Sequence, residues 1–207
     1  MSISLFFIIP TLLISFLAFQ NRVLFDKLKF NAYFIVNSKE WYRAFSYGLV
    51  HANWVHLGIN MFVLYSFGKA VEYAFYFYFD TKAIFYFIFL YISSLAFSVL
   101  PDINKFKNDP TYNAIGASGA VSAVLFSSIL LFPKNKIYLM FFPIGIPSYI
   151  FGIVYMIYSY YMSKKQIDNI GHLTHFTGAV YGFIFPIILK PELFLIFIEQ
   201  LIGRFYI

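Results

Sequence analysis

The residues best suited to chemistry in this sequence are a serine among small neighbours and a histidine that is followed by glycines. Ser118 lies between Gly116–Ala117 and Gly119, just after a polar loop and near the expected start of an apolar helix. The N-terminus of a helix offers backbone N–H groups to a developing oxyanion, and the glycines allow close approach to the hydroxyl. The same small residues also fit a helix packing face, so both interpretations stay open for this segment alone.

His175 is followed by Gly178 and Gly182, three and seven residues later. On a helix these three positions share one face. The two glycines therefore predict that this helix packs tightly on the helix that begins near Ser118. The imidazole would then meet the serine hydroxyl, as nucleophilic catalysis requires. We predict that Ser118 and His175 form a catalytic dyad.

His56 and Asn60 lie four residues apart and share a face of an earlier helix. Both side chains can donate hydrogen bonds to a tetrahedral oxyanion, and one such donor is worth about 3–4 kcal/mol in a soluble protease. We predict that both stabilise the oxyanion. Asn60 has an alternative role as a polar contact between helices.

All four histidines lie in stretches without charged residues, and an imidazole buried in hydrocarbon must be hydrogen-bonded. A single histidine could simply join two helices, but four near the starts of two predicted helices favour a shared polar site. The four are His51, His56, His172 and His175.

A haem or metal membrane protein that uses paired histidines is a rival interpretation. It leaves Asn60 and the glycines around Ser118 unexplained, so we expect no cofactor and no metal. The sequence also has no H-E-x-x-H zinc motif, and neither Asp nor Glu lies in any predicted span, so a dyad is simpler than a triad.

The elements that must position these side chains are membrane helices. Of the 207 residues, 61% are hydrophobic and only 12% are charged, against about 25% charged in soluble domains. Six stretches are long enough, at about 20 residues, to cross the hydrocarbon as helices. These charge-free stretches are 1–21, 44–68, 83–101, 110–133, 137–163 and 169–189. The sequence predicts an all-α membrane protein, a bundle of six transmembrane helices.

No internal repeat or linker appears, so we expect one domain over residues 1–207. The predicted helices are 3–19, 47–68, 83–100, 114–132, 148–162 and 171–189. The net charge of +6 suits a surface of anionic lipid. Scattered basic residues argue against a nucleic-acid partner. Richness in Phe, Tyr, Ile, Asn and Lys is typical of an AT-rich bacterial genome, so we expect a multi-pass protein of the bacterial inner membrane.

Together these motifs resemble the rhomboid family of intramembrane serine proteases. The match covers residues 40–189 and comprises H-x4-H-x3-N, G-x-S-G and H-x2-G-x3-G, each in order on its predicted helix. A Trp-Arg feature of the family appears with one extra residue, as Trp41–Arg43. Gly68 and Glu72 match a further glycine and glutamate. The motif residues are His51, His56, Asn60, Gly116, Ser118, Gly119, His175, Gly178 and Gly182.

The resemblance implies an endopeptidase that cuts transmembrane segments of other membrane proteins through an acyl-enzyme. It gives Ser118 the role of nucleophile, and it adds the Ser118 backbone N–H to the oxyanion donors, with His51 and the glycines as support. The family often has a tyrosine four residues after the nucleophile, against the catalytic histidine, where this chain has Ser122. His172 has no family counterpart, and we expect it at the interface or facing a loop. The alternative is a catalytically silent rhomboid-like protein that binds membrane clients.

Overall fold

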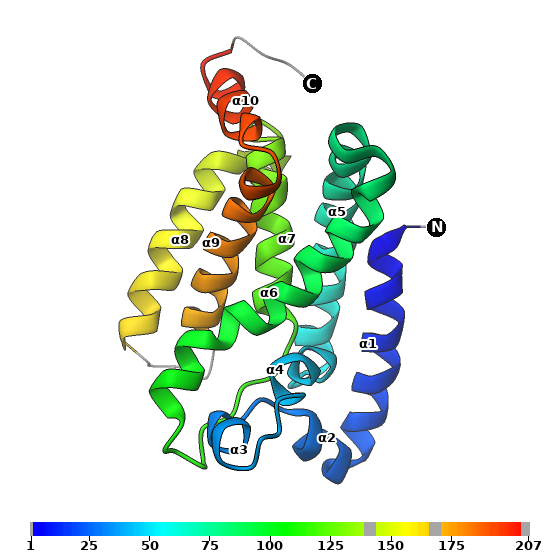
Figure 1. Ribbon diagram of the computed structural model, residues 1–207, viewed down its shortest axis with the longest axis vertical. Helices are drawn as coiled ribbons and strands as arrows, with labels where there is room; N and C mark the ends of the chain where they lie inside the picture. The colour runs from blue at the N-terminus through cyan, green and yellow to red at the C-terminus, as the bar shows by residue number, and fades with distance from the viewer. Residues whose placement is uncertain (1, 139–143, 166–170, 204–207) are drawn as a thin grey trace.

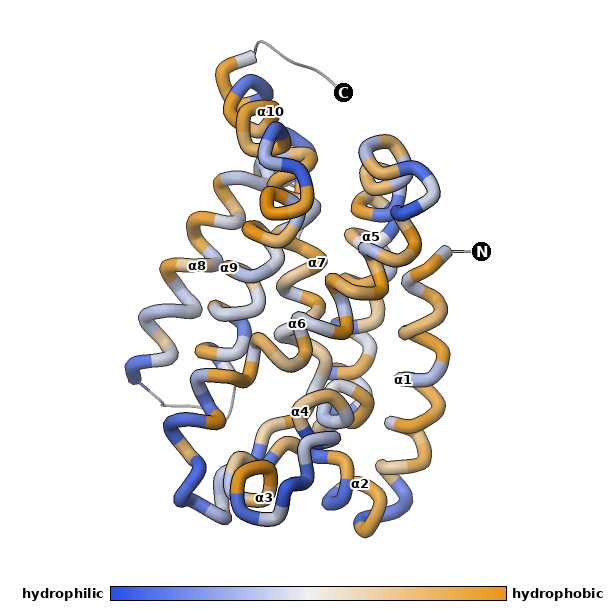
Figure 2. Tube along the Cα trace, viewed as in Figure 1, coloured by the Kyte–Doolittle hydropathy of each residue, from blue (hydrophilic) through white to orange (hydrophobic). Residues whose placement is uncertain are grey.

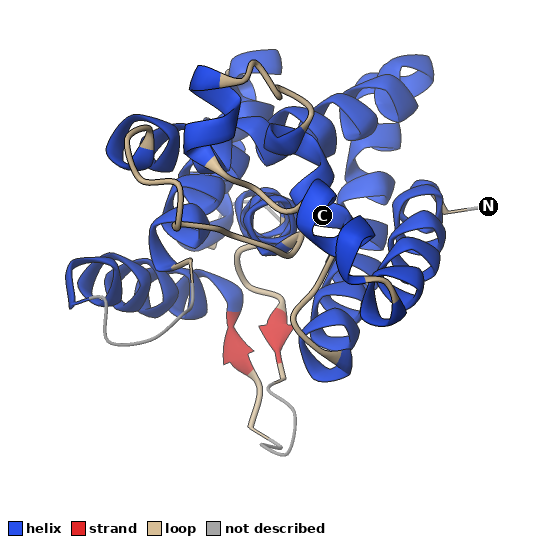
Figure 3. Ribbon diagram, turned by 90° about the horizontal axis from the view of Figure 1, so that it is seen from below, coloured by secondary structure: helices blue, strands red, loops and turns tan. Residues whose placement is uncertain are grey.

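The protein is a bundle of helices, as Figure 1 shows. The computed structural model describes residues 2–138, 144–165 and 171–203. Two short antiparallel strands, β1 (Lys136–Ile137) and β2 (Ile146–Pro147), project from the edge of the bundle (Figure 3). The helices are α1 Ile3–Gln20, α2 Arg22–Leu28, α3 Ala32–Asn37, α4 Arg43–Ser46, α5 Trp54–Phe79, α6 Ala83–Phe106, α7 Ser118–Leu131, α8 Ser148–Lys165, α9 His172–Leu189 and α10 Glu192–Leu201.

Helix α7 is the centre of the bundle. It has 14 residues, and every one from Gly119 to Leu131 is buried. Helices α5, α6, α8, α9 and α10 all contact it. A helix that is apolar on all sides is stable only when it is enclosed, which the sequence of α7 requires and its neighbours provide. The central position of α7 fixes the place of its first residue, Ser118.

Helices α7 and α9 pack backbone against backbone, in the most extensive contact of the bundle. A Cβ atom added to Gly178 would collide with the carbonyl group of Gly119, and one added to Gly182 would collide with the backbone of Ala123. The hydroxyl of Ser127 also donates to the carbonyl of Gly182 at 2.6 Å. Glycine is therefore required at both positions of α9 for this close approach.

The start of α1 is attached to α5 by a buried carboxylate. Glu72 accepts hydrogen bonds from the Ser4 backbone N–H at 2.7 Å and from the Ser2 hydroxyl at 2.8 Å. The first N–H groups of a helix have no partner within it, and a negative charge beside them is favourable. Gly68, one turn before Glu72, leaves room for the Ser4 side chain.

Four predicted helix limits differ from those of the structure, two at helix starts and two at helix ends. Helix α5 begins at Trp54 rather than at 47, because the Asn53 side chain caps it by accepting the His56 N–H at 2.8 Å. Helix α7 begins at Ser118 rather than at 114, because Gly116 has a φ of +100°, which a right-handed helix cannot contain.

Helix α6 runs on to Phe106 through Pro101, where the sequence predicts an end. Proline lacks only one helical N–H donor, and Asp102 beyond it is buried in contact with α9. Likewise, α5 extends past Gly68 to Phe79 and carries Glu72. The carboxyl groups of Glu72 and Asp102 thus lie inside helices, although the predicted spans contain neither Asp nor Glu.

The bundle has the surface of a membrane protein. Within the described ranges, three helical segments are long and apolar enough to cross a membrane, namely Ile3–Gln20, Trp54–Phe106 and His172–Leu189. The second comprises α5 and α6 and the turn between them. Hydrophilic residues gather toward the two ends of the bundle (Figure 2). Large apolar side chains such as Phe6, Phe62 and Ile157 are more than 60% exposed, as a lipid-facing surface requires.

The all-α membrane fold is therefore confirmed, while the count of six spans stays a prediction. Helix α7 is apolar but shorter than the other candidates. Helix α8 has 18 residues, and its five tyrosines and two lysines lower its mean hydropathy.

Candidate active site

Ser118 is the first residue of α7 and follows a tight turn that only glycine allows. Gly116 adopts a φ of +100°, and its N–H donates to the carbonyl of Tyr47 at 2.9 Å. This turn brings the chain from the polar loop into the helix within two residues. The hydroxyl of Ser118 therefore lies at the N-terminal end of α7, where the dipole of the helix favours negative charge.

The structure brings Ser118 and His175 into direct contact. The Ser118 Oγ and the His175 Nε2 lie 2.7 Å apart, and both side chains are partly buried. His175 is on the first turn of α9, and the α7–α9 glycine contact described above sets the separation of the two backbones. A hydroxyl and an imidazole at this distance can exchange a proton.

His56 lies directly beside the turn that precedes Ser118. A Cβ added to Gly116 would come within 2.8 Å of the His56 Nε2, so the imidazole packs against the glycine. The Ala52 N–H points to the Nδ1 of His56 at 3.5 Å. A donor that faces Nδ1 favours the ring proton on Nε2, the nitrogen on the side of Gly116.

Asn60 is buried one turn further along α5. In the described structure its amide donates to the carbonyl of His56 at 2.8 Å, within its own helix, and not to Ser118 or His175. The second amide proton makes no hydrogen bond among the described residues. The geometry places Asn60 next to His56 on the same face, as their spacing predicts.

His51 forms a chain of hydrogen bonds beneath the site. The Ala117 N–H donates to the His51 Nε2 at 3.3 Å, and the Ser15 hydroxyl lies 3.0 Å from the Nδ1. The Ser15 hydroxyl in turn donates to the carbonyl of Leu49 at 2.8 Å. Since Nε2 must accept, the ring proton is on Nδ1, and Ser15 receives it. His51 thereby ties α1 to the residue before Ser118.

This arrangement requires a neutral His51. Burial, and the His56 ring whose centroid is 5.0 Å away, lower the pKa of His51 to about 3. The unfolded chain has a histidine pKa of about 6.5. Protonation therefore favours the unfolded state as the pH falls from about 6.5 toward 3, and the stabilisation is complete above that range.

We expect the stability of the protein to fall between pH 6.5 and pH 4, and to fall less in a His51→Gln variant. Glutamine can still accept the Ala117 N–H through its carbonyl oxygen, but it cannot be protonated. Thermal unfolding of both proteins in the same detergent, at pH 7.5 and pH 4.5, measures the difference. An identical loss of stability in the two proteins would contradict this role of His51.

A second polar cluster lies beside His175 and was not predicted. Asp102 of α6 accepts hydrogen bonds from the Thr174 hydroxyl at 3.0 Å and from the Tyr112 hydroxyl at 3.1 Å. Burial and the neighbouring Asp102 carboxylate raise the pKa of Tyr112. The carboxylate thus holds the first turn of α9 against α6 and against the loop before α7. Asp102 was missed because Pro101, directly before it, predicts the end of the helix.

His172 packs between two aromatic rings at the start of α9. Its side chain is buried, and its ring lies edge-on to both Tyr158 and His175, with centroids at 5.5 and 6.1 Å. The expectation of an interfacial or loop-facing residue stays a prediction, because burial in the protein does not fix the depth of His172 in the membrane. One turn of helix separates His172 from His175, and their shared face points into the bundle.

Arg43 organises the segment that covers this end of the bundle. Its guanidinium donates to Glu40 at 2.5 Å and to the backbone carbonyls of Asp26 and Lys29, each at 2.9 Å. The hydrogen bond from Arg43 lowers the pKa of Glu40. Arg43 is only 7% exposed, so these bonds hold α2 and α4 together at the end where α7 and α9 begin (Figure 1).

The fold and this cluster define a class: a helical, multi-pass membrane protein with a serine, histidines and an asparagine gathered at one end of its central helix. The chain matches the family model described as the Rhomboid domain over residues 38–192. Since the match covers most of the chain, the protein belongs to the rhomboid family. A comparison with curated proteins finds no match.

Proposed function

We propose that this protein is a serine endopeptidase that cleaves transmembrane segments of other proteins within the lipid bilayer. The observation that carries the proposal is the 2.7 Å hydrogen bond between the Ser118 Oγ and the His175 Nε2. Membership of the rhomboid family is also compatible with a catalytically silent relative, which binds membrane proteins without cleaving them. A silent relative has no need for a hydroxyl bonded to an imidazole at the N-terminus of a buried helix.

The reaction begins with attack of the Ser118 Oγ on the scissile carbonyl carbon. His175 accepts the hydroxyl proton at Nε2, and the carbonyl oxygen becomes an oxyanion. The Ser118 backbone N–H, the His56 Nε2–H and the free amide proton of Asn60 are the proposed donors to that oxygen. Both histidine and asparagine come from α5, whose start lies against Gly116.

Collapse of the tetrahedral intermediate breaks the peptide C–N bond, and His175 returns its proton to the leaving amine. The product is an ester between Ser118 and the N-terminal part of the substrate. Water then attacks this ester, again with His175 as the base, and releases a carboxylic acid and the free serine. No cofactor or metal takes part in the proposed steps, and the partners are single-span membrane proteins.

The site suits membrane substrates because it lies on a chain with an apolar exterior. Large apolar side chains on α5 and α8 are exposed, as a surface in contact with lipid requires. We place the protein in a cell membrane, and its composition favours the inner membrane of a bacterium.

A fluorophosphonate probe tests this proposal, because it reacts covalently only with an activated serine. We expect the wild-type protein to be labelled and Ser118→Ala and His175→Ala to be unlabelled. Ser163→Ala is the matched control, since Ser163 is a partly exposed serine of α8 whose hydroxyl donates to the carbonyl of Tyr160, and it should label like wild type. A folded wild-type protein that never labels would favour the client-binding alternative.

A further inference from the structure

An aromatic ring from α8 lies against the imidazole of the proposed dyad. The rings of Tyr155 and His175 are nearly parallel, with an interplanar angle of 21° and centroids 6.4 Å apart. This offset arrangement falls within the range in which aromatic rings attract each other. One edge of the imidazole bonds Ser118, and the plane of the ring is nearly parallel to that of Tyr155.

A hydrogen bond fixes the position of this ring. The Tyr155 hydroxyl lies 2.6 Å from the hydroxyl of Ser122, which is buried on α7 one turn after Ser118. Ser118 and Ser122 are four residues apart and share a face of α7. Tyr155 thus contacts the helix of the nucleophile at one end of its side chain, and its ring lies against the base.

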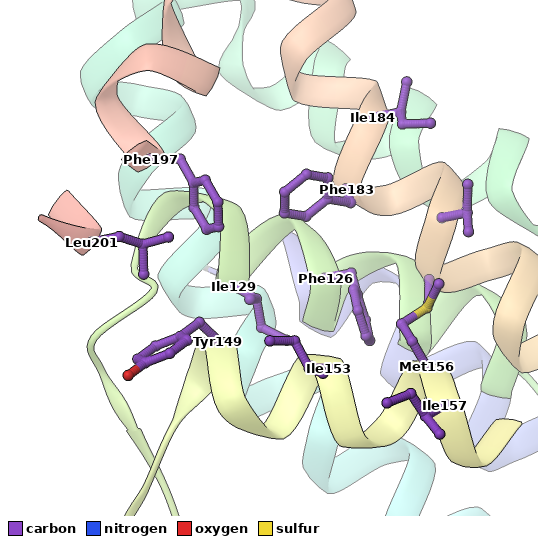
Figure 4. Close-up of a pocket in the computed structure, with 13 residues that line it drawn as sticks. Phe126, Ile129, Tyr149, Ile153, Met156, Ile157, Phe183, Ile184, Phe197 and Leu201 are labelled. Atoms are coloured by element: carbon purple, nitrogen blue, oxygen red, sulfur yellow. The ribbon is translucent and has the colours of Figure 1, made fainter. Parts of the chain in front are cut away.

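The rest of this part of α8 is less closely packed. An apolar pocket of about 550 Å³ lies between α8 and helices α7, α9 and α10 (Figure 4). Gly152, Ile153, Met156 and Ile157, on either side of Tyr155 in the sequence, all line it. Since these neighbours face a pocket, Tyr155 supplies the contact of this stretch of α8 with His175.

We propose that Tyr155 is a positioning residue, which holds the imidazole of His175 in line with Ser118 by means of its ring and its bond to Ser122. This inference rests on the proposed protease function. It makes Ser122 a partner of the tyrosine, and it assigns the support of the catalytic histidine to α8. Any displacement of α8 from α7 would then also release His175.

Loss of the ring should slow the chemical step without weakening substrate binding. We expect Tyr155→Leu to lower kcat for a single-span substrate by about tenfold, the factor that corresponds to one aromatic pair, with KM nearly unchanged. The rate of labelling by a small fluorophosphonate should fall by the same factor. A tyrosine that acted only on the entry of substrate would leave the labelling rate unchanged or raise it.

The hydroxyl can be tested separately from the ring. Tyr155→Phe and Ser122→Ala each remove one end of the same hydrogen bond, and each should lower kcat by about threefold. The double variant should be no slower than Tyr155→Phe, because both substitutions break the bond between Tyr155 and Ser122, and Tyr155→Phe also removes the contact of this hydroxyl with Ser159. Losses that multiply would overturn the assignment of Ser122 as the partner.

Tyr161→Leu is the matched control, because Tyr161 is an exposed tyrosine on the same helix. It should keep the wild-type kcat and labelling rate. Unchanged kcat and labelling in Tyr155→Leu, beside an active wild type, would overturn the positioning role and leave the protease function intact. A wild type that neither labels nor cleaves would instead refute the proposed function itself.

Discussion

Replacement of Ser118 by alanine should lower the rate of substrate cleavage by about 10⁵- to 10⁶-fold, and additional replacement of His175 should lower it no further. Residues of a catalytic unit show this non-additivity in soluble serine proteases, because each is useless without the other. The 2.7 Å bond between the two side chains is the reason to expect it here. Single-turnover cleavage of a single-span substrate in proteoliposomes, for both single variants and the double variant, measures the coupling.

The control for this cycle is Ser163→Ala, which removes a partly exposed hydroxyl of α8 and should leave the rate unchanged. Losses for Ser118→Ala and His175→Ala that simply multiply in the double variant would mean that the two residues act independently. The proposed proton transfer between them would then be wrong, even if the protein cuts its substrate.

Substitution of alanine for Gly182 should destabilise the fold severely, by about 3 kcal/mol or more. The added Cβ would collide with the backbone of Ala123 in α7, and a backbone cannot move aside as a side chain can. Helices α7 and α9 would have to separate, and with them Ser118 and His175. Chemical or thermal unfolding in detergent gives the loss of stability, and labelling of the remaining folded protein gives the loss of alignment.

Gly58 provides the matched control, with the same chemical change on another helix. A Cβ at Gly58 meets nothing within 4 Å, so Gly58→Ala should change the free energy of unfolding by no more than about 1 kcal/mol. If both variants were equally stable, the close contact of α7 with α9 would not be what holds the site together.

The sequence predicts the helical membrane fold because the spacing of charged residues along the chain reflects the bilayer directly. It also predicts that α7 and α9 face each other, because glycines at positions 178 and 182 are needed only where another backbone comes close. Helix ends are harder to predict. They depend on single local features, such as the Asn53 cap and the positive φ of Gly116.

Tyr155 and Asp102 could not be predicted, because their importance comes from contacts with distant segments. Tyr155 is one of five tyrosines on α8, and no pattern distinguishes it from the others. The unusual serine at position 122 was the one available signal, and the structure shows that a tyrosine from another helix lies beside it. Asp102 follows a proline, and because the proline predicts a helix end, Asp102 was expected in a loop rather than inside α6.

The length of α7 has a consequence for where a substrate can be cut. At 1.5 Å per residue, its 14 residues span about 21 Å, whereas the hydrocarbon layer is about 30 Å thick. If Leu131 reaches one boundary of this layer, Ser118 lies about 9 Å inside the other. A substrate of the proposed protease must therefore expose a carbonyl group at that depth, where breaking the internal hydrogen bonds of its helix is costly. Segments with glycine or proline about 9 Å below the surface unwind more readily and should be preferred.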